Sequence, residues 1–183
     1  ERIDYDRLVT AKPIEARSDF STISPTLSQE DISKHVHYCI VCHHKENDSC
    51  SKGLKSRKRD ELKISPLGRE LSGCPLNQKI SEMHELRQSN NLIAALSVIM
   101  RDNPLCFLTG DRICNDCMAA CIYQKFTPVD TPSVESDTLK KVVSLPFGAE
   151  IYLLLARWNP LRPEGYIHSN NQQGSLAVVG MGP

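Results

Sequence analysis

Eight cysteines in a chain of 183 residues constrain its structure more than any other feature of the sequence. Five of the eight fall in C-x2-C or C-x3-C spacings, which let one turn of chain present two thiols to the same metal centre. The three groups are Cys39/Cys42/Cys50, Cys74 alone, and Cys106/Cys114/Cys117/Cys121. This pattern favours metal or cluster ligation over a disulfide framework and over unrelated buried thiols.

The overall composition is that of an ordinary globular protein. Apolar residues make up 40% of the chain and charged residues 24%, and the net charge is zero. The chain therefore has no excess positive charge that would attract nucleic acid or an anionic membrane. The sequence contains no apolar run long enough to span a bilayer and no signal-peptide pattern at its start. Metal-bound thiols survive in a reducing compartment, so we expect a cytoplasmic location, with no nucleic-acid partner and no membrane span.

Most of the chain predicts short helices. Apolar residues recur at three- and four-residue intervals from Leu76 to Leu86 and again from Leu92 to Ile99, which indicates a helical hairpin with a turn at 89–91. Further helices are expected at about 135–143 and 147–158, and Ser28 resembles an N-cap. The predicted fold class is mainly α. The expected organisation is a lead-in at 1–34, a helical domain at 35–160, a linker at 161–174 and the start of a further domain at 175–183.

The last nine residues carry a second signal. Leu176–Val179 is typical of a buried strand, and it runs directly into Gly180-Met-Gly182. In dinucleotide-binding turns the first glycine allows the tight bend and the second lets the backbone approach a pyrophosphate. We therefore expect the first strand of a Rossmann-type domain here, with Gly180 and Gly182 binding cofactor. Both ends of the chain look cut, because the first residue is Glu1 rather than Met and because the helix and the ribose-binding acid that complete the motif would follow Pro183.

The cysteines could bind either an iron-sulfur cluster or zinc. Paired C-x2-C motifs are typical of zinc ribbons and fingers. Such a site would use Cys39, Cys42, Cys114 and Cys117, with His43 or His44 as a further candidate. It would leave Cys50, Cys74 and Cys121 without a metal, because four ligands fill the zinc shell.

Some local patterns explain single cysteines. Cys39 to His43 matches the C-x-x-C-H motif of covalent haem attachment, but the match accounts for no other cysteine. Cys106 lies between Leu105 and Phe107 and is predicted to be a small buried residue of the core. Basic residues at 52–59 have no aromatic neighbour for stacking on bases, so they predict a solvated loop rather than a nucleic-acid site.

Taken in order, several motifs together resemble the N-terminal cluster domain of glutamate synthase small subunits. Dihydropyrimidine dehydrogenase carries a similar domain. The resemblance covers about residues 35 to 183. The motifs that carry it are Cys74-Pro-Leu-Asn-Gln-Lys-Ile80, Asp102-Asn-Pro104, Thr109-Gly-Asp-Arg-Ile-Cys114, Cys121, Pro128-Val-Asp130 and the closing Gly-x-Gly-Pro.

This resemblance implies an α-helical ferredoxin-type domain that holds two [4Fe-4S] clusters and precedes an oxidoreductase body binding FAD and NAD(P)H. By analogy, the first cluster would be bound by Cys39, Cys42, Cys50 and Cys121. The second would be bound by Cys74, Cys114 and Cys117, with Glu135 at the position of a less regular fourth ligand. Glu135 also has a simpler interpretation as a carboxylate favoured near a helix N-terminus.

Two spacings depart from the family pattern. In the family the fourth cysteine follows the third after three residues, whereas here 23 residues separate Cys50 from Cys74. The gap from Cys114 to Cys117 is shorter than usual, which leaves Cys106 as a replacement ligand for the second cluster.

The resemblance implies an electron-transfer module that relays electrons between flavin and a partner domain or subunit. The chain alone would contain no complete catalytic site and no catalytic residue. The rival hypothesis from a different class is a zinc-stapled interaction module without redox activity.

Overall fold

The computed structural model describes residues 27–56, 61–109 and 114–157, and these residues form nine short helices. In chain order they are α2 (Gln29–Tyr38), η1 (Cys42–Lys45), α3 (Ser49–Lys52), α4 (Ile80–Gln88), α5 (Leu92–Asp102), α6 (Cys106–Thr109), α7 (Asp116–Ala119), α8 (Thr131–Val143) and α9 (Gly148–Arg157). Isolated β-bridges are the only extended pairing within these ranges. The expected mainly α class is therefore confirmed. The strand predicted at 175–183 lies outside the described residues.

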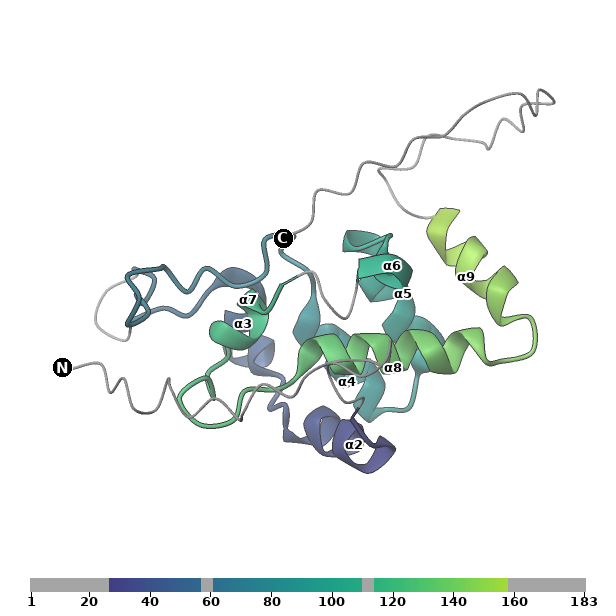
Figure 1. Ribbon diagram of the computed structural model, residues 1–183, viewed down its shortest axis with the longest axis horizontal. Helices are drawn as coiled ribbons and strands as arrows, with labels where there is room; N and C mark the ends of the chain where they lie inside the picture. Colours follow the sequence, from purple (N-terminus) through teal and green to yellow (C-terminus); the bar gives the residue numbers. More distant parts are fainter. Residues whose placement is uncertain (1–26, 57–60, 110–113, 158–183) are drawn as a thin grey trace, which may run out of the picture.

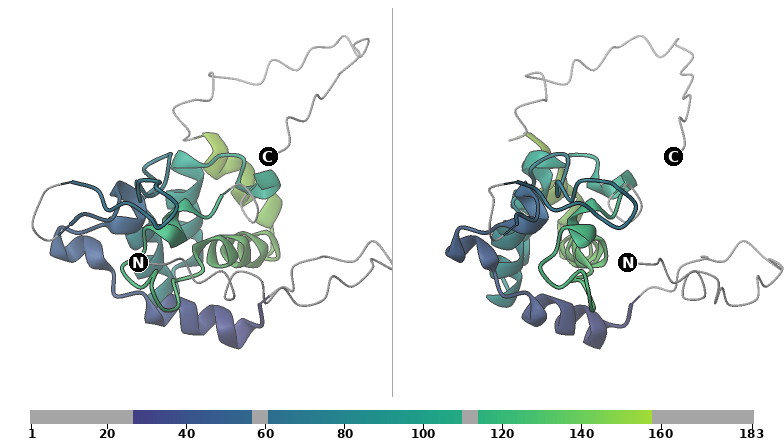
Figure 2. Two further views of the ribbon diagram at one scale, coloured as in Figure 1. Left: turned by 60° about the vertical axis from the view of Figure 1, so that its left-hand side comes forward. Right: turned by 90° about the vertical axis from the view of Figure 1, so that its left-hand side faces the viewer.

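The helices divide into two regions, shown in Figure 1. The longer helices α2, α4, α5, α8 and α9 pack on one another, with α8 crossing the centre of the view, and we call them the helical core. The short helices η1, α3 and α7, together with the excursion of chain from residue 53 to 73, form the cysteine-rich end. Figure 1 shows this excursion reaching to the left, away from the helical core, and the right-hand view of Figure 2 looks at the molecule from that side.

The predicted helical hairpin is α4 followed by α5. Its apolar stripe is core as expected, since Met83, Leu96 and Ile99 are fully buried and belong to the same hydrophobic cluster. Asn90 takes the left-handed conformation (φ 55°) at the turn between the two helices. The first helix begins at Ile80 rather than at Leu76, which is half-exposed and precedes the helix.

Helix α8 begins four residues before the predicted start at about 135. Asp130 is its N-cap, accepting a hydrogen bond from Ser133 N at 3.0 Å, and Pro132 occupies the first turn, where its missing N–H costs nothing. The apolar period used for the prediction begins only with Val134, so it missed this polar first turn.

Helix α2 begins where the N-cap prediction placed it. The Ser28 side chain accepts a hydrogen bond from Asp31 N, and Ile32 and Val36 are buried against the helical core. The helix runs continuously across the expected boundary at 34/35.

A buried ion pair joins three helices of the core. Arg87 on α4 donates to Asp137 on α8 at 2.6 Å, and both side chains are almost fully buried. Gln29 of α2 and Lys141 of α8 contact the same carboxylate at 2.7 and 2.9 Å. These charge-assisted bonds lower the pKa of Asp137 against the opposing effect of its burial, so the carboxylate is ionised in the fold.

Part of the segment predicted as a solvated loop is packed. Leu54 N donates to Leu71 O at 2.8 Å, and both leucines are buried with Ala120 of the cysteine-rich end. At the base of the excursion Gly73 has φ 78°, and a Cβ there would lie 2.7 Å from Gly53 N. Two chain segments therefore meet at a distance that only glycine allows.

A helix that crosses a lipid bilayer needs about 20 consecutive, mainly apolar residues. None of the helices in 27–56, 61–109 and 114–157 has that length and apolar character.

Candidate metal centre

Five cysteines line one cavity, which we call the thiol cavity: Cys117 and four others that come from three separate parts of the chain. Cys39 follows α2, Cys42 opens η1, Cys50 lies on α3, and Cys121 follows α7. These are the same four that the resemblance assigned to a first cluster. The cavity brings together thiols up to 82 positions apart in sequence (121 − 39), which no local motif does alone.

The turn between Cys39 and Cys42 has an unusual backbone. Val41 adopts φ 51° and ψ 56°, a left-handed conformation that is rare and costly for a β-branched residue. In this conformation the Val41 N–H donates a hydrogen bond to the Cys39 sulfur. Backbone amides aimed at sulfur are what a bound cluster or metal thiolate needs, because they compensate its negative charge.

Two contacts with the rest of the fold hold Cys39 in place. Gln88 of α4 donates through Nε2 to the carbonyl of Cys39 at 2.9 Å and to that of Val36 at 2.8 Å. The Tyr38 ring stacks on Tyr123, with ring centroids 4.4 Å apart, which ties the end of α2 to the chain just after Cys121. Two of the cavity's cysteines are therefore positioned by a shared set of contacts.

The pKa values of the thiols in this cavity depend on burial and on one another. Burial raises the pKa of Cys39 to about 11. A hydrogen bond from the Cys50 thiol to the Cys42 sulfur lowers the pKa of Cys42 and raises that of Cys50. A full set of thiolates here needs a cation to balance it, and a bound metal supplies that positive charge.

A second group of ligand-type side chains lies next to the first. Cys74, Cys114 and Cys117 are close enough to influence one another electrostatically, and Glu135 of α8 acts on both Cys74 and Cys117. Burial is the main cause that raises the pKa of Cys117, to about 12. The Cys74 sulfur accepts hydrogen bonds from the backbone N–H groups of Leu76 and Gln78. The structure thus gathers the four residues expected around a second cluster.

Cys117 lies between the two groups. It lines the thiol cavity with Cys121 on the same short segment, and it also interacts with Cys74 and Cys114. The two groups are therefore adjacent rather than at opposite ends of the molecule.

Cys50 and Cys74 are far apart in the sequence but lie side by side in the structure, at the base of the excursion. Cys74 N donates to Cys50 O at 2.9 Å, so the 23 intervening residues leave and return to the same point. In space the two cysteines are neighbours, as they would be with a short spacer. The departure in spacing therefore does not separate the third cysteine from the fourth.

Glu135 does not occupy a helix N-terminus. It is the fifth residue of α8, after the N-cap Asp130, and its side chain is buried, so the simpler interpretation as a dipole-favoured carboxylate does not apply. Gln78 Nε2 donates to Glu135 Oε1 at 2.5 Å. Burial raises the pKa of Glu135 to about 7, and the bond from Gln78 opposes this increase. Cys106 is buried as predicted, and its thiol also senses the Glu135 charge.

Sequence reasoning missed His84, which also lines the thiol cavity. The ring is fully buried, and within the described residues neither of its nitrogens has a hydrogen-bond partner. Burial lowers its pKa to about 4, so the ring is neutral. His84 falls on the same face of α4 as Ile80 and Met83, so the apolar period at 80–87 could have marked it as a buried polar residue.

Two further expectations from the sequence concern the dinucleotide turn and the zinc site. Gly180 and Gly182 lie outside the described residues. Of the four cysteines expected for zinc, Cys39, Cys42 and Cys117 line the thiol cavity, whereas Cys114 does not line it.

Comparisons with known proteins found two similar chains in Rickettsia prowazekii (strain Madrid E), both described as uncharacterized. Uncharacterized protein RP006 is 49% identical over 75 residues, which cover 41% of this chain and 11% of that protein. Uncharacterized protein RP005 is 35% identical over 98 residues, 48% of this chain and 33% of that protein. The matches thus span a minor part of either relative. No protein-family model and no solved structure matches the chain.

Proposed function

We propose that this chain is an iron-sulfur electron-transfer module that binds two [4Fe-4S] clusters. The observation that carries the proposal is the convergence of Cys39, Cys42, Cys50 and Cys121 on one cavity, next to a second group of three cysteines. Four thiolates complete the ligand set of one cluster. Seven cysteines in two adjacent groups exceed what a single mononuclear site uses.

The donor chemistry fits such clusters. Buried thiols with raised pKa values need a strong positive charge to ionise, and backbone amides already point at the sulfurs of Cys39 and Cys74. His84 offers a neutral ring within the cavity whose N–H finds no acceptor among the described residues. A cluster sulfur would provide that acceptor, and such bonds raise a cluster's reduction potential.

Adjacent centres favour a relay over a purely structural role. Cys117 is near both groups of cysteines. Clusters bound at the two groups would therefore be close enough to exchange electrons. The clusters supply one-electron chemistry when bound, and the protein contributes thiolate ligands, burial and hydrogen bonds. In the parent protein we propose that FAD and NAD(P)H exchange electrons with this module, with Gly180 and Gly182 beside the FAD pyrophosphate, and that a partner domain or subunit completes the path.

The α-helical ferredoxin-type fold and the glutamate synthase-like parent are part of the same proposal. They rest on the ordered motifs of the sequence and on the grouping of the cysteines described above.

One observation favours the rival, a zinc-stapled module without redox activity. The thiol cavity has a volume of about 20 Å³, room for about one water molecule or a single ion. A four-iron cluster requires the surrounding thiols to move outward. Zinc would use the same cavity residues Cys39, Cys42, Cys50 and Cys121.

Metal and sulfide analysis of the anaerobically purified chain distinguishes the two functions. The cluster proposal expects brown protein with about eight iron and eight sulfide atoms per chain. Colourless protein with stoichiometric zinc and no sulfide would establish the rival instead. Cys121→Ser should lower the iron content by about half, since one of the two centres loses a ligand.

Single variants decide the fourth ligand of the second centre. If Glu135 is a ligand, Glu135→Ala lowers iron content while Cys106→Ala does not. The reverse result would assign that position to Cys106. Phe126→Ala, in an exposed position after Cys121, is the matched control and should keep the full iron content.

A further inference from the structure

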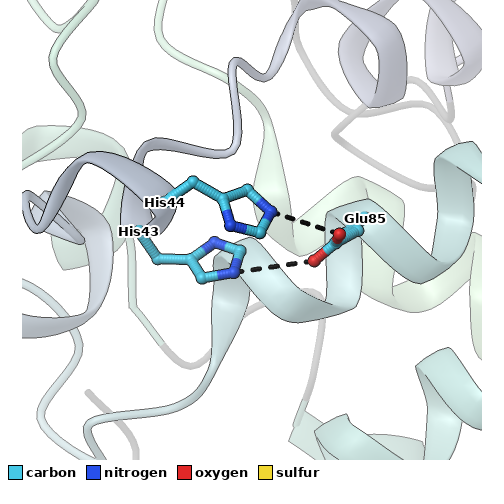
Figure 3. A group of neighbouring side chains, drawn as sticks. All are labelled: His43, His44 and Glu85. Atoms are coloured by element: carbon cyan, nitrogen blue, oxygen red, sulfur yellow. Dashed lines mark hydrogen bonds and ion pairs between the residues drawn. The ribbon is translucent and has the colours of Figure 1, made fainter.

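Three side chains with metal-ligating chemistry gather at the surface beside the thiol cavity. His43 and His44 lie on η1 and Glu85 on α4, and Figure 3 shows both imidazole rings facing the one carboxylate. His43 Nε2 is 3.6 Å from Glu85 Oε2, and His44 Nε2 is 3.2 Å from Glu85 Oε1. One candidate ligand atom from each residue lies within 4.8 Å of those of the other two.

These separations are close to those of a tetrahedral zinc site. Zinc binds imidazole nitrogen and carboxylate oxygen at about 2.0–2.2 Å, which places neighbouring ligand atoms about 3.4 Å apart. The two nitrogen–oxygen distances, 3.6 and 3.2 Å, lie on either side of that value, and each imidazole faces a different oxygen of the Glu85 carboxylate. His44 and Glu85 are also exposed enough to adjust, with 60% and 47% of their side-chain surface accessible.

The local backbone brings the two rings together. Consecutive residues of a 3₁₀ helix point about 120° apart, because the helix has three residues per turn. Here the ring centroids of His43 and His44 are nevertheless only 4.1 Å apart. Left-handed residues, Val41 and Glu46, stand at both ends of η1.

We propose that His43, His44 and Glu85 form a mononuclear zinc site, separate from the cysteine centres, with water in the fourth coordination position. Two imidazoles and one carboxylate are a known zinc ligand set, and three protein ligands with one open position suit this metal. The site uses none of the eight cysteines, so it does not depend on the proposed function. The ion ties the turn that carries Cys42 to α4.

Zinc binding to the 183-residue chain tests this site. The anaerobically purified chain and its Glu85→Gln variant are dialysed against the same free zinc, and zinc, iron and sulfide are counted in each. The wild type should retain one zinc equivalent more than the variant. Zinc bound by cysteines is the same in both samples, so the difference reports the histidine site alone. Loss of one direct ligand should weaken the affinity at least about tenfold.

Further variants keep the test decisive. His44→Ala changes an exposed side chain and should also lose the zinc equivalent, which covers the case in which Glu85→Gln folds poorly. His37→Ala removes an exposed histidine of α2 outside the group and should retain it. X-ray absorption of the wild type should show a zinc population bound by nitrogen and oxygen.

Equal zinc contents in the wild type and both site variants would overturn the proposal. Because iron and sulfide are counted in the same samples, this outcome differs from failure of the cluster proposal. A chain that contains no iron but still loses one zinc equivalent on Glu85→Gln supports the zinc site and rejects the clusters.

Discussion

The helical core and the cysteine-rich end are stabilised by different interactions. In the core, helices of nine to thirteen residues bury side chains such as Leu96 and Val134 completely. In the cysteine-rich end, helices of four residues are separated by residues with positive φ, and the satellite cluster of buried apolar residues there is Leu54, Leu71 and Ala120. Helices this short are not stable by themselves in water.

This difference indicates where a metal centre would contribute most. The core has enough apolar burial to fold around α4, α5 and α8. The cysteine-rich end has the small cluster Leu54, Leu71 and Ala120 of its own, and Cys50 and Cys117 pack into the main cluster. Bound metal would act there as a structural element as well as a redox centre. We therefore expect the two regions to respond differently to four changes: removal of the metal, a cavity in the core, acid, and loss of a helix cap.

Removing the proposed metal should have the largest effect on the cysteine-rich end. After anaerobic chelation, hydrogen exchange at residues 39–54 and 114–123 should accelerate at least about a hundredfold, equivalent to about 3 kcal/mol, while α5 stays protected. Exchange measured by mass spectrometry resolves these segments. Equal acceleration in α5 would show that the two regions form one cooperative unit.

A cavity in the core should lower the stability of the helical core and leave the metal content unchanged. Leu96→Ala removes a fully buried side chain and should lower the free energy of unfolding by about 2–5 kcal/mol. Iron per folded chain should stay at the wild-type value, because Leu96 does not line the thiol cavity. Denaturant unfolding and iron analysis are the measurements, and Leu154→Ala, at an exposed position on α9, is the control with little effect. A proportional loss of iron would couple the two regions.

Acid should destabilise the core through His84. Its pKa is lowered from 6.5 to about 4 by burial, so between these values the unfolded chain binds more protons than the folded chain. Stability is therefore full above pH 6.5 and falls as pH decreases toward 4, by about 3 kcal/mol in total.

The chelated chain is the form in which to measure this slope, by denaturant unfolding at a series of pH values. His84→Leu should flatten it. His37→Leu, on the exposed face of α2, should leave the wild-type slope unchanged. If His84→Leu retains the full slope, another group is responsible for the loss of stability in acid.

The smallest effect is expected at the start of α8. Asp130→Ala removes the N-cap that accepts hydrogen bonds from Ser133 N and Oγ at 3.0 and 2.8 Å, and should cost about 1 kcal/mol. Thr127→Ala, exposed three residues earlier, should be close to neutral in the same thermal unfolding experiment. A loss well above about 2 kcal/mol would indicate that Asp130 has a role beyond capping.

Local patterns were enough to predict much of the helical core. The α4/α5 hairpin follows from apolar spacing, and the start of α2 follows from Ser28, because both signals act over one or two helical turns. The start of α8 was missed because its first turn is polar and is specified by Asp130 and Pro132 instead.

The candidate site was predicted less completely. The grouping of Cys39, Cys42 and Cys50 with Cys121 was expected from resemblance, and the structure brings these four together. Spacing alone suggested a wider separation of Cys50 from Cys74, which the excursion removes. The apolar period of α4 could mark His84 as buried, but nothing at short range places it beside the thiols or predicts the contact of Glu85 with two histidines.

The sequence by itself determined the helical class, most of the core-facing residues and the types of ligand that the chain carries, because side-chain periodicity and thiol chemistry are local properties. Only the tertiary structure decided which thiols share a cavity, that Cys117 stands between two groups, and that Glu85 meets His43 and His44. These contacts join segments far apart in the chain, and their formation depends on how whole helices pack rather than on any one of them.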